Sequence, residues 1–274
     1  MDNSKMPYVV TKTLLGIKNE LLCSTPAPFI PEHEYTINGK WGVEAHVEPT
    51  NKPQIMYVGI GIGGSRNIDD GNLSAPHGIR ATDMDLYTPI PMRCVSVDND
   101  LTAEERSNYR MRVKRSFNGH DYWCYYLKKI ILTSTVRITK TNPDTLEEEV
   151  YDLDANGLTP TPPLPNATGT IVTDGNKINV SVKGEVELFG SDILESINVI
   201  YNDPRRANIS EIGLYTGEDR IVNGEGVGGN TIQYMEAIYT QLSIKYTSIG
   251  VPFLTPDSYR KIPINLGKSN IMLI

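Results

Sequence analysis

The 274-residue chain has few cysteines and histidines, and neither set has the spacing of a functional cluster. Cys23, Cys94 and Cys124 are far apart in the sequence and form no C-x-x-C pair. This pattern argues against a disulfide framework and favours maturation in a reducing compartment. The four histidines show no metal-ligand spacing with one another or with the cysteines. We therefore predict no metal site.

Long apolar segments and concentrated basic charge are also missing. No apolar run approaches the roughly 20 residues that a membrane-spanning helix needs, and the first residues, MDNSKMPYVV, lack the basic region and apolar core of a signal peptide. The net charge is −7, with acids and bases interspersed, which argues against nucleic acid as a direct partner. We expect a soluble protein, made in the cytoplasm, with no membrane partner.

Catalytic motifs are absent as well. The sequence contains no G-x-S-x-G elbow, no P-loop and no H-E-x-x-H motif. Carboxylate pairs such as Asp83/Asp85 and Asp98/Asp100 leave a glycosidase pair open, but nothing in the sequence selects one. The acidic tract at 69–72 lacks the spaced ligands of a calcium loop, which favours a turn. The sequence predicts no catalytic residue and no cofactor.

The residues that are abundant favour β structure. Tyrosine (15) far outnumbers phenylalanine (4), valine, isoleucine and threonine are frequent, and 18 prolines with 23 glycines imply many turns. We predict a mainly β fold: a β-sandwich-like core with two or three short helices, a long N-terminal arm and extended loops.

Composition shifts along the chain suggest four segments. Residues 1–54 combine a helix at 8–23 with a proline-containing arm, and residues 157–168 form a proline-rich connector. The β-rich parts are 55–156, which includes a capped basic helix, and 169–274, and the sequence leaves open whether they form one domain or two.

The glycine-dense stretch IMYVGIGIGG at 55–64 satisfies G-x-G-x-x-G through Gly59, Gly61 and Gly64. A dinucleotide site needs a helix directly afterwards. Residues 65–82 contain Pro76 and Gly78 and no helical apolar stripe, so we favour a strand followed by a long surface loop. The glycine face of this strand carries no side chains, so another backbone can approach it closely. Such a face is useful between two subunits or two sheets.

Other segments carry clearer local signals. Thr102 and Glu105 form a capping box that predicts a helix start. The basic helix that we expect after it would meet an acidic partner or form a solvated face. Residues 122–139 predict two strands or one long bent strand, paired with a returning strand at 147–153 after a turn at Asn142, and residues 231–249 predict a long strand. Ser191 is placed to cap a helix.

These segments supply the candidate interface. Trp41 is expected to anchor the arm, and the apolar C-terminal segment is expected to dock, with another subunit as one possible site. The candidate interface residues are Trp41, Gly59, Gly61, Gly63, Arg106, Arg110, Arg112, Ile271 and Leu273.

Four segments in their order along residues 55–245 resemble a family of tailed-bacteriophage virion structural proteins. The segments are IMYVGIGIGGS, DLYTPIPMRCVSVDNDLTAEER, YWCYYLKKI and YNDPRRANISEIGLYTGEDR. The resemblance implies a place in the virion after synthesis in the host bacterial cytoplasm, without a reaction. It suggests a homo-oligomeric ring that contacts other virion structural proteins of the neck, collar or tail.

Two other functions stay open. A baseplate module that binds a receptor or carbohydrate would expose aromatic side chains, and Tyr57, Tyr87 and Trp123 are the candidates. An enzyme that uses the glycine loop would need a helix directly after Gly64.

Overall fold

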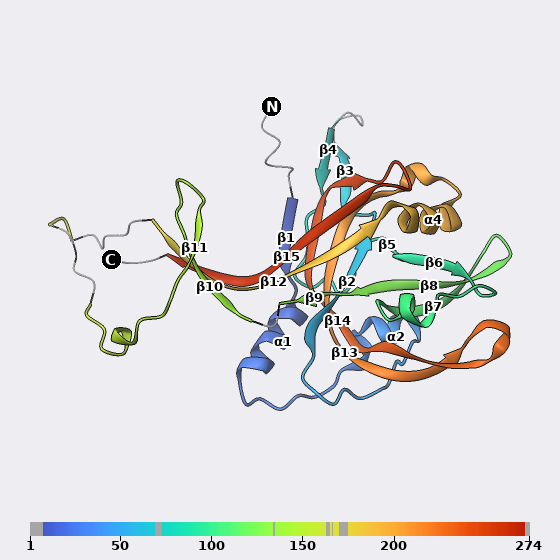
Figure 1. Ribbon diagram of the computed structural model, residues 1–274, viewed down its shortest axis with the longest axis horizontal. Helices are drawn as coiled ribbons and strands as arrows, with labels where there is room; N and C mark the ends of the chain where they lie inside the picture. Colours follow the sequence, from blue (N-terminus) through green and yellow to red (C-terminus); the bar gives the residue numbers. More distant parts are fainter. Residues whose placement is uncertain are drawn as a thin grey trace. The chain divides into compact units, whose positions relative to one another are not determined.

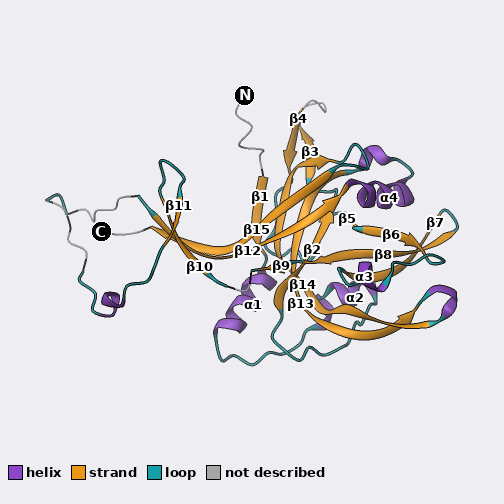
Figure 2. Cartoon of the chain, in the orientation of Figure 1, coloured by secondary structure: helices purple, strands orange, loops and turns teal. Residues whose placement is uncertain are grey.

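The computed structural model describes residues 8–68, 73–133, 135–162, 165, 167–169 and 175–271. The chain is mainly β, with antiparallel sheets, which confirms the predicted fold class (Figure 2). It divides into two compact units. Unit 1 comprises Met1–Ile130 and Val186–Lys261, and unit 2 comprises Ile131–Glu185 and Ile262–Ile274. The proline-rich stretch at 157–168 therefore belongs to unit 2.

Unit 1 is built on an eight-stranded sheet with the order β1-β14-β13-β2-β8-β6, to which β5 adds beside β2 and β7 beside β8. Its strands pair in antiparallel fashion. The strands are β1 (Tyr8–Lys12), β2 (Gln54–Gly61), β5 (Pro89–Ile90), β6 (Arg93–Ser96), β7 (Tyr109–Phe117), β8 (His120–Lys129), β13 (Asn208–Glu225) and β14 (Thr231–Pro252).

The strands β13 and β14 form a long hairpin at the centre of this unit (Figure 1). The predicted strand at 231–249 is confirmed as β14, and β13 before it runs on to Glu225. Three register shifts interrupt the ladder between the two strands. Such irregularities bend a long strand, because an extra residue increases the local twist.

Four α-helices occur among the described residues: α1 (Leu14–Ser24), α2 (Ile37–Trp41), α3 (Ala103–Arg106) and α4 (Gly190–Tyr201). The short 3₁₀ helices are η1 (His33–Tyr35), η2 (Ala155–Leu158), η3 (Pro204–Arg206) and η4 (Val227–Gly229). The helix predicted at 8–23 begins only at Leu14, because residues 8–12 pair with β14 as β1. The prediction that Ser191 caps a helix is wrong. Ser191 lies inside α4, and no side chain caps the N-terminus of this helix with a hydrogen bond.

The prediction of a basic helix after the capping box is also wrong for the residues that follow Arg106. The capping box itself is confirmed, since Thr102 and Glu105 satisfy each other's backbone amides. However, α3 ends after one turn, and the basic residues that follow form β7. In the sheet, β8 provides a hydrogen-bonding partner along β7, whereas an isolated helix of this length would be only marginally stable.

The predicted arm at 25–54 is less extended than expected, because it contains η1 and α2. Ile37 of α2 belongs to the hydrophobic core cluster of unit 1. The Asn38 Oδ1 atom accepts hydrogen bonds from the Thr240 amide (2.7 Å) and hydroxyl (2.6 Å). This segment therefore packs against β14 of its own chain.

Unit 2 contains a five-stranded sheet with the order β11-β10-β12-β15, with β9 beside β12. The predicted hairpin around Asn142 is confirmed, since β10 and β11 pair in antiparallel fashion. The strands are β9 (Ile131–Leu132), β10 (Arg137–Thr141), β11 (Glu148–Val150), β12 (Lys177–Phe189) and β15 (Tyr259–Ile271), and the last two contribute residues to both units.

A separate two-stranded hairpin joins β3 (Ser65–Ile68) to β4 (Leu73–Pro76). The strand β3 follows the glycine-dense stretch directly, where a dinucleotide site requires a helix. This arrangement contradicts both the long loop that we predicted there and the enzyme hypothesis based on the glycines. The acidic tract at 69–72 lies outside the described residues.

Candidate functional site

The glycine face of β2 is filled by groups of the same chain. A Cβ atom on Gly61 would lie 2.5 Å from Glu211 Oε2 and 2.7 Å from the Thr88 carbonyl oxygen. A Cβ on Gly63, just after β2, would lie 2.6 Å from Thr88 Oγ1. The close approach inferred from the sequence is therefore present, and its partner is the segment that precedes β5.

Glu211 occupies the space that these glycines leave, and it is fully buried. Its carboxylate accepts hydrogen bonds from the backbone amides of Gly63 (3.0 Å), Tyr87 (2.7 Å) and Thr88 (2.9 Å). A buried carboxylate is costly unless such donors and a counter-charge compensate it. Here the counter-charge is Lys245 Nζ, 3.7 Å away.

Lys245 is itself fully buried and has several partners besides Glu211. Its Nζ atom lies 3.2 Å from Asp83 Oδ2, donates to the Asp85 carbonyl (3.1 Å) and sits 3.1 Å from the centre of the Tyr87 ring. The ammonium group is thus surrounded by carboxylates, a carbonyl and an aromatic face. This cluster fixes the segment at 83–88 against β13 and β14.

Two of the four basic side chains of β7, those of Arg110 and Arg112, are buried inside unit 1. Arg110 Nε donates to Asp219 Oδ1 (2.7 Å), and the same carboxylate accepts from Tyr57 (2.9 Å) and Lys129 (2.6 Å). Burial alone would raise the pKa of Asp219, but the hydrogen bonds and charges of Arg110 and Lys129 lower it to about 2. Asp219 therefore stays ionised and holds four strands together.

Arg112, two residues further along β7, has a similar set of partners. Its Nη2 atom donates to Asp100 Oδ2 (2.7 Å) and to the Glu225 carbonyl (2.8 Å), and its guanidinium lies 3.4 Å from the centre of the Trp123 ring. Arg106 Nη2 lies 3.5 Å from the same Asp100 carboxylate. Arg106, Arg110 and Arg112 of the predicted basic helix therefore form internal ion pairs, whereas Lys114 and Arg115 are exposed.

A second buried carboxylate, Glu236, pins a kink in β7. It accepts from the backbone amides of Met111 (2.5 Å) and Arg112 (3.0 Å), and Met111 has a left-handed φ of 56°. Burial raises the pKa of Glu236, while these backbone hydrogen bonds oppose that shift. The carboxylate compensates the amides that the kink removes from the sheet ladder.

Helix α1 exposes a group of apolar side chains. Leu14, Ile17 and Leu21 lie at helical spacing, with 54%, 41% and 58% of their surfaces exposed. The opposite side of α1 buries Asn19, whose amide donates to Thr216 Oγ1 (3.2 Å) and Gln241 Oε1 (3.0 Å). The helix thus buries Asn19 together with Leu15 and leaves an apolar stripe exposed.

The strand before this helix is exposed in the same way. β1 lies at the end of the strand order and pairs only with β14 in the described sheet. Its residues Tyr8 and Val10 have 61% and 51% of their surfaces exposed. We call Tyr8, Val10, Leu14, Ile17 and Leu21 the α1–β1 surface. Exposed apolar groups beside a sheet edge are typical of contacts between chains.

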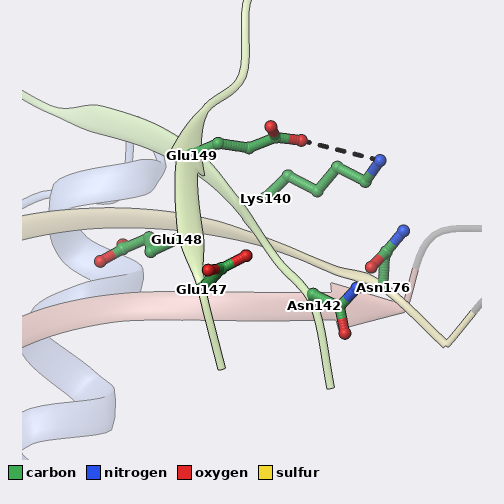
Figure 3. A pocket seen from close by; sticks show the side chains of 6 residues that line it. All are labelled: Lys140, Asn142, Glu147, Glu148, Glu149 and Asn176. Atoms are coloured by element: carbon green, nitrogen blue, oxygen red, sulfur yellow. Dashed lines mark ion pairs between the residues drawn. The ribbon is translucent and has the colours of Figure 1, made fainter. Parts of the chain in front are cut away.

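Unit 2 has a shallow polar depression of about 510 Å³ (Figure 3). The residues that line it are Lys140, Asn142, Glu147, Glu148, Glu149 and Asn176. Lys140 Nζ lies 3.8 Å from Glu149 Oε1, and Glu148 accepts from Thr139 Oγ1 (2.6 Å) and Lys183 Nζ (3.0 Å). The only sequence signal for this site is the run of three glutamates after the turn at Asn142.

The predicted interface residues do not form one site. The Trp41 ring stacks on Tyr126 with centroids 4.6 Å apart, so it anchors the arm to its own chain. Gly61 and Gly63 contact Glu211, whereas Gly59 packs against Tyr215 and Leu127. The arginines pair with Asp100 and Asp219. The side chain of Ile271 and the whole of Leu273 lie outside the described residues. The α1–β1 surface was missed because helical spacing does not reveal which side of a helix is buried.

Two further absences apply to the described ranges alone. No group of three or more histidine, cysteine, aspartate or glutamate side chains in them has the arrangement of a metal site. Within those ranges, no helix is both long enough and apolar enough to cross a membrane.

The chain belongs to a family of unknown function, DUF7208, which matches residues 1–273. Neither the curated proteins nor the solved structures contain a significant match to it.

Proposed function

We propose that this chain is a non-enzymatic structural subunit of a tailed-phage virion that assembles with further copies of itself in the neck, collar or tail. The ordered sequence segments over residues 55–245 support the setting in the virion. The α1–β1 surface supports the role in assembly, and it is the observation that carries the proposal.

The buried charges support a structural role in a second way. Glu211, Glu236 and Lys245 are fully buried, and each is compensated by backbone amides or by opposite charges. Groups that are fixed in this way hold strands in register and do not face a substrate. The residues of the α1–β1 surface, in contrast, lie outside the buried core, although the Tyr8 ring stacks on Tyr246.

The occupant that we assign to the α1–β1 surface is a second copy of this chain. Ion pairs between Lys12 and Glu20 (2.5 Å) and between Lys18 and Glu32 lie beside the apolar stripe, so its margin carries balanced charge. A charge-balanced margin does not repel the surface of another copy. A ring results if this surface meets a different surface of the next copy, because a heterologous contact repeats until it closes.

The test is the native mass of the purified chain, compared with that of the double variant Ile17→Glu, Leu21→Glu. We expect an oligomer for the unchanged chain, and at least a tenfold weaker association for the variant, since two charges would be buried in an apolar contact. Both positions are exposed, so the fold should be retained. Circular dichroism checks this point.

The matched control is Leu254→Glu, which places the same charge at an exposed leucine of unit 1 outside the α1–β1 surface. It should assemble like the unchanged chain. Equal assembly of the double variant and this control would overturn the assignment of the surface.

The polar depression of unit 2 favours a second candidate, the baseplate receptor- or carbohydrate-binding module. Carboxylates and amides such as Glu147, Asn142 and Asn176 are suitable partners for hydroxyl groups. Of the three aromatic residues considered for this function, Tyr57 and Trp123 are buried and Tyr87 is exposed. A strictly monomeric chain in the native-mass experiment would favour this candidate over the assembling subunit.

A further inference from the structure

Two cysteines that are 30 positions apart in the sequence lie directly opposite each other in unit 1. Cys94 of β6 and Cys124 of β8 are register partners, and both side chains are fully buried. Their sulfur atoms are 3.0 Å apart, and both residues are free thiols. No sequence spacing indicates this pair, because it depends on the antiparallel register of the two strands.

The register places the pair at a position that suits a cross-link. The Val97 amide donates to the Asp121 carbonyl (3.2 Å), and hydrogen-bonded and non-hydrogen-bonded pairs alternate along an antiparallel ladder. Cys94 and Cys124 lie three pairs away from that bond, which makes them a non-hydrogen-bonded pair. The Cα atoms of such a pair are about 4.5 Å apart, within the range that a disulfide spans.

We propose that Cys94 and Cys124 are a cross-linking site, which closes to an intrachain disulfide when the chain meets a two-electron thiol oxidant of small size, such as a peroxide or a diazene. With hydrogen peroxide, one thiol becomes a sulfenic acid and releases one water. The second thiol then attacks that sulfur, a sulfur–sulfur bond forms, and a second water leaves. Two thiols are oxidised, and one peroxide is reduced to two waters.

The surroundings of the thiols explain why the pair can stay reduced until then. The hydrogen bond to Cys124, together with burial, raises the pKa of Cys94, so little reactive thiolate is present at neutral pH. The pair is therefore slow to react in a reducing compartment. Because β6 lies at the end of the strand order, the disulfide would fasten a terminal strand to β8.

The experiment treats the folded chain with diamide, a small neutral diazene that accepts two hydrogens from two thiols. The protein is then unfolded, its remaining thiols are alkylated, and its peptides are weighed. We expect a linked peptide pair that contains Cys94 and Cys124 and is two hydrogens lighter than the separate peptides. Cys23, which is exposed, should not take part in this link.

The variant Cys23→Ser removes the exposed thiol without touching the core, and it should give the same linked peptide. Its melting temperature should rise by roughly 5–10 °C on oxidation, because a cross-link over a loop of this length restricts the unfolded chain. In the further variant Cys124→Ser, both the link and the rise should be lost. Recovery of Cys94 and Cys124 as fully alkylated thiols after prolonged oxidation of the Cys23→Ser chain would overturn the proposal.

Discussion

At the scale of single residues, the glycines of β2 illustrate what the sequence could and could not predict. The alternation of isoleucine and glycine correctly indicated a strand with one bare face. It could not indicate what fills that face, because Glu211 is 150 residues away from Gly61 and reaches it only through the pairing of β13 with β2. The partner of a glycine is a property of the tertiary structure.

Gly61→Ala is expected to destabilise the chain by about 2–3 kcal/mol, since the new methyl group would collide with Glu211 Oε2 and the Thr88 carbonyl. The matched control is Gly78→Ala, because a Cβ on Gly78 meets no atom within 4 Å. That change should alter stability by less than about 0.5 kcal/mol. Urea unfolding of both variants measures the difference, and equal midpoints would contradict the close approach.

At the scale of elements, β7 explains why one helix prediction failed. The capping box at Thr102 is a local signal, and it correctly indicated a helix start. The residues after it alternate between apolar and basic at Tyr109, Arg110, Met111, Arg112 and Val113. This period of two is typical of a strand. It outweighs the helical propensity of the arginines once β8 provides a partner.

Helix α1 shows the opposite limit. Its position is indicated by leucines at helical spacing, but the stripe at Leu14, Ile17 and Leu21 faces outward. The reason is Asn19, whose amide makes two hydrogen bonds to β13 and β14 across about 200 residues of chain. A local pattern identifies an amphipathic helix, whereas its orientation depends on partners that the pattern does not contain.

Glu236→Gln is expected to destabilise the chain by about 2–3 kcal/mol. One carboxylate oxygen would become an amide NH₂ group, so the backbone amide of Met111 or Arg112 would lose its buried acceptor. The control is Glu225→Gln on β13, where an exposed ion pair with Lys114 (3.4 Å) contributes less than about 0.5 kcal/mol. Thermal unfolding compares the two. If they prove equally stable, Glu236 does not hold the kink in β7.

At the scale of the whole chain, the sequence was sufficient for the class of fold, for one local hairpin and for one long strand. The hairpin of β10 with β11 and the long strand β14 follow from turn residues and alternation. The sequence did not show which residues form each unit, because unit 1 combines two separate stretches, Met1–Ile130 and Val186–Lys261. The sequence also did not show how the arm packs, because Asn38 accepts a hydrogen bond from Thr240, which is far away along the chain.

Asp219 connects several strands of unit 1 through one carboxylate. Its partners Tyr57, Arg110 and Lys129 belong to β2, β7 and β8, while Asp219 itself lies on β13. Removing its charge leaves the buried Arg110 guanidinium without its counter-ion, which costs more than the loss of a surface ion pair. The stability of the whole unit should therefore depend on the ionisation of this group.

The dependence on pH has a definite direction. The pKa of Asp219 is about 2 in the folded chain and about 3.9 in an unfolded chain. Because the folded value is the lower one, the ionised carboxylate stabilises the fold above about pH 4. This contribution decreases as the pH falls from about 4 to about 2, where the folded state also takes up the proton.

We therefore expect Asp219→Asn to be less stable than the unchanged chain by about 2 kcal/mol at neutral pH, and the difference to shrink between about pH 4 and pH 2. Asp98→Asn, at an exposed position after β6, should change stability by less than about 0.5 kcal/mol. Urea unfolding at a series of pH values measures both variants. A difference for Asp219→Asn that stays constant down to pH 2 would mean that the Asp219 carboxylate does not carry this part of the stability, and that the loss arises from altered packing around Arg110.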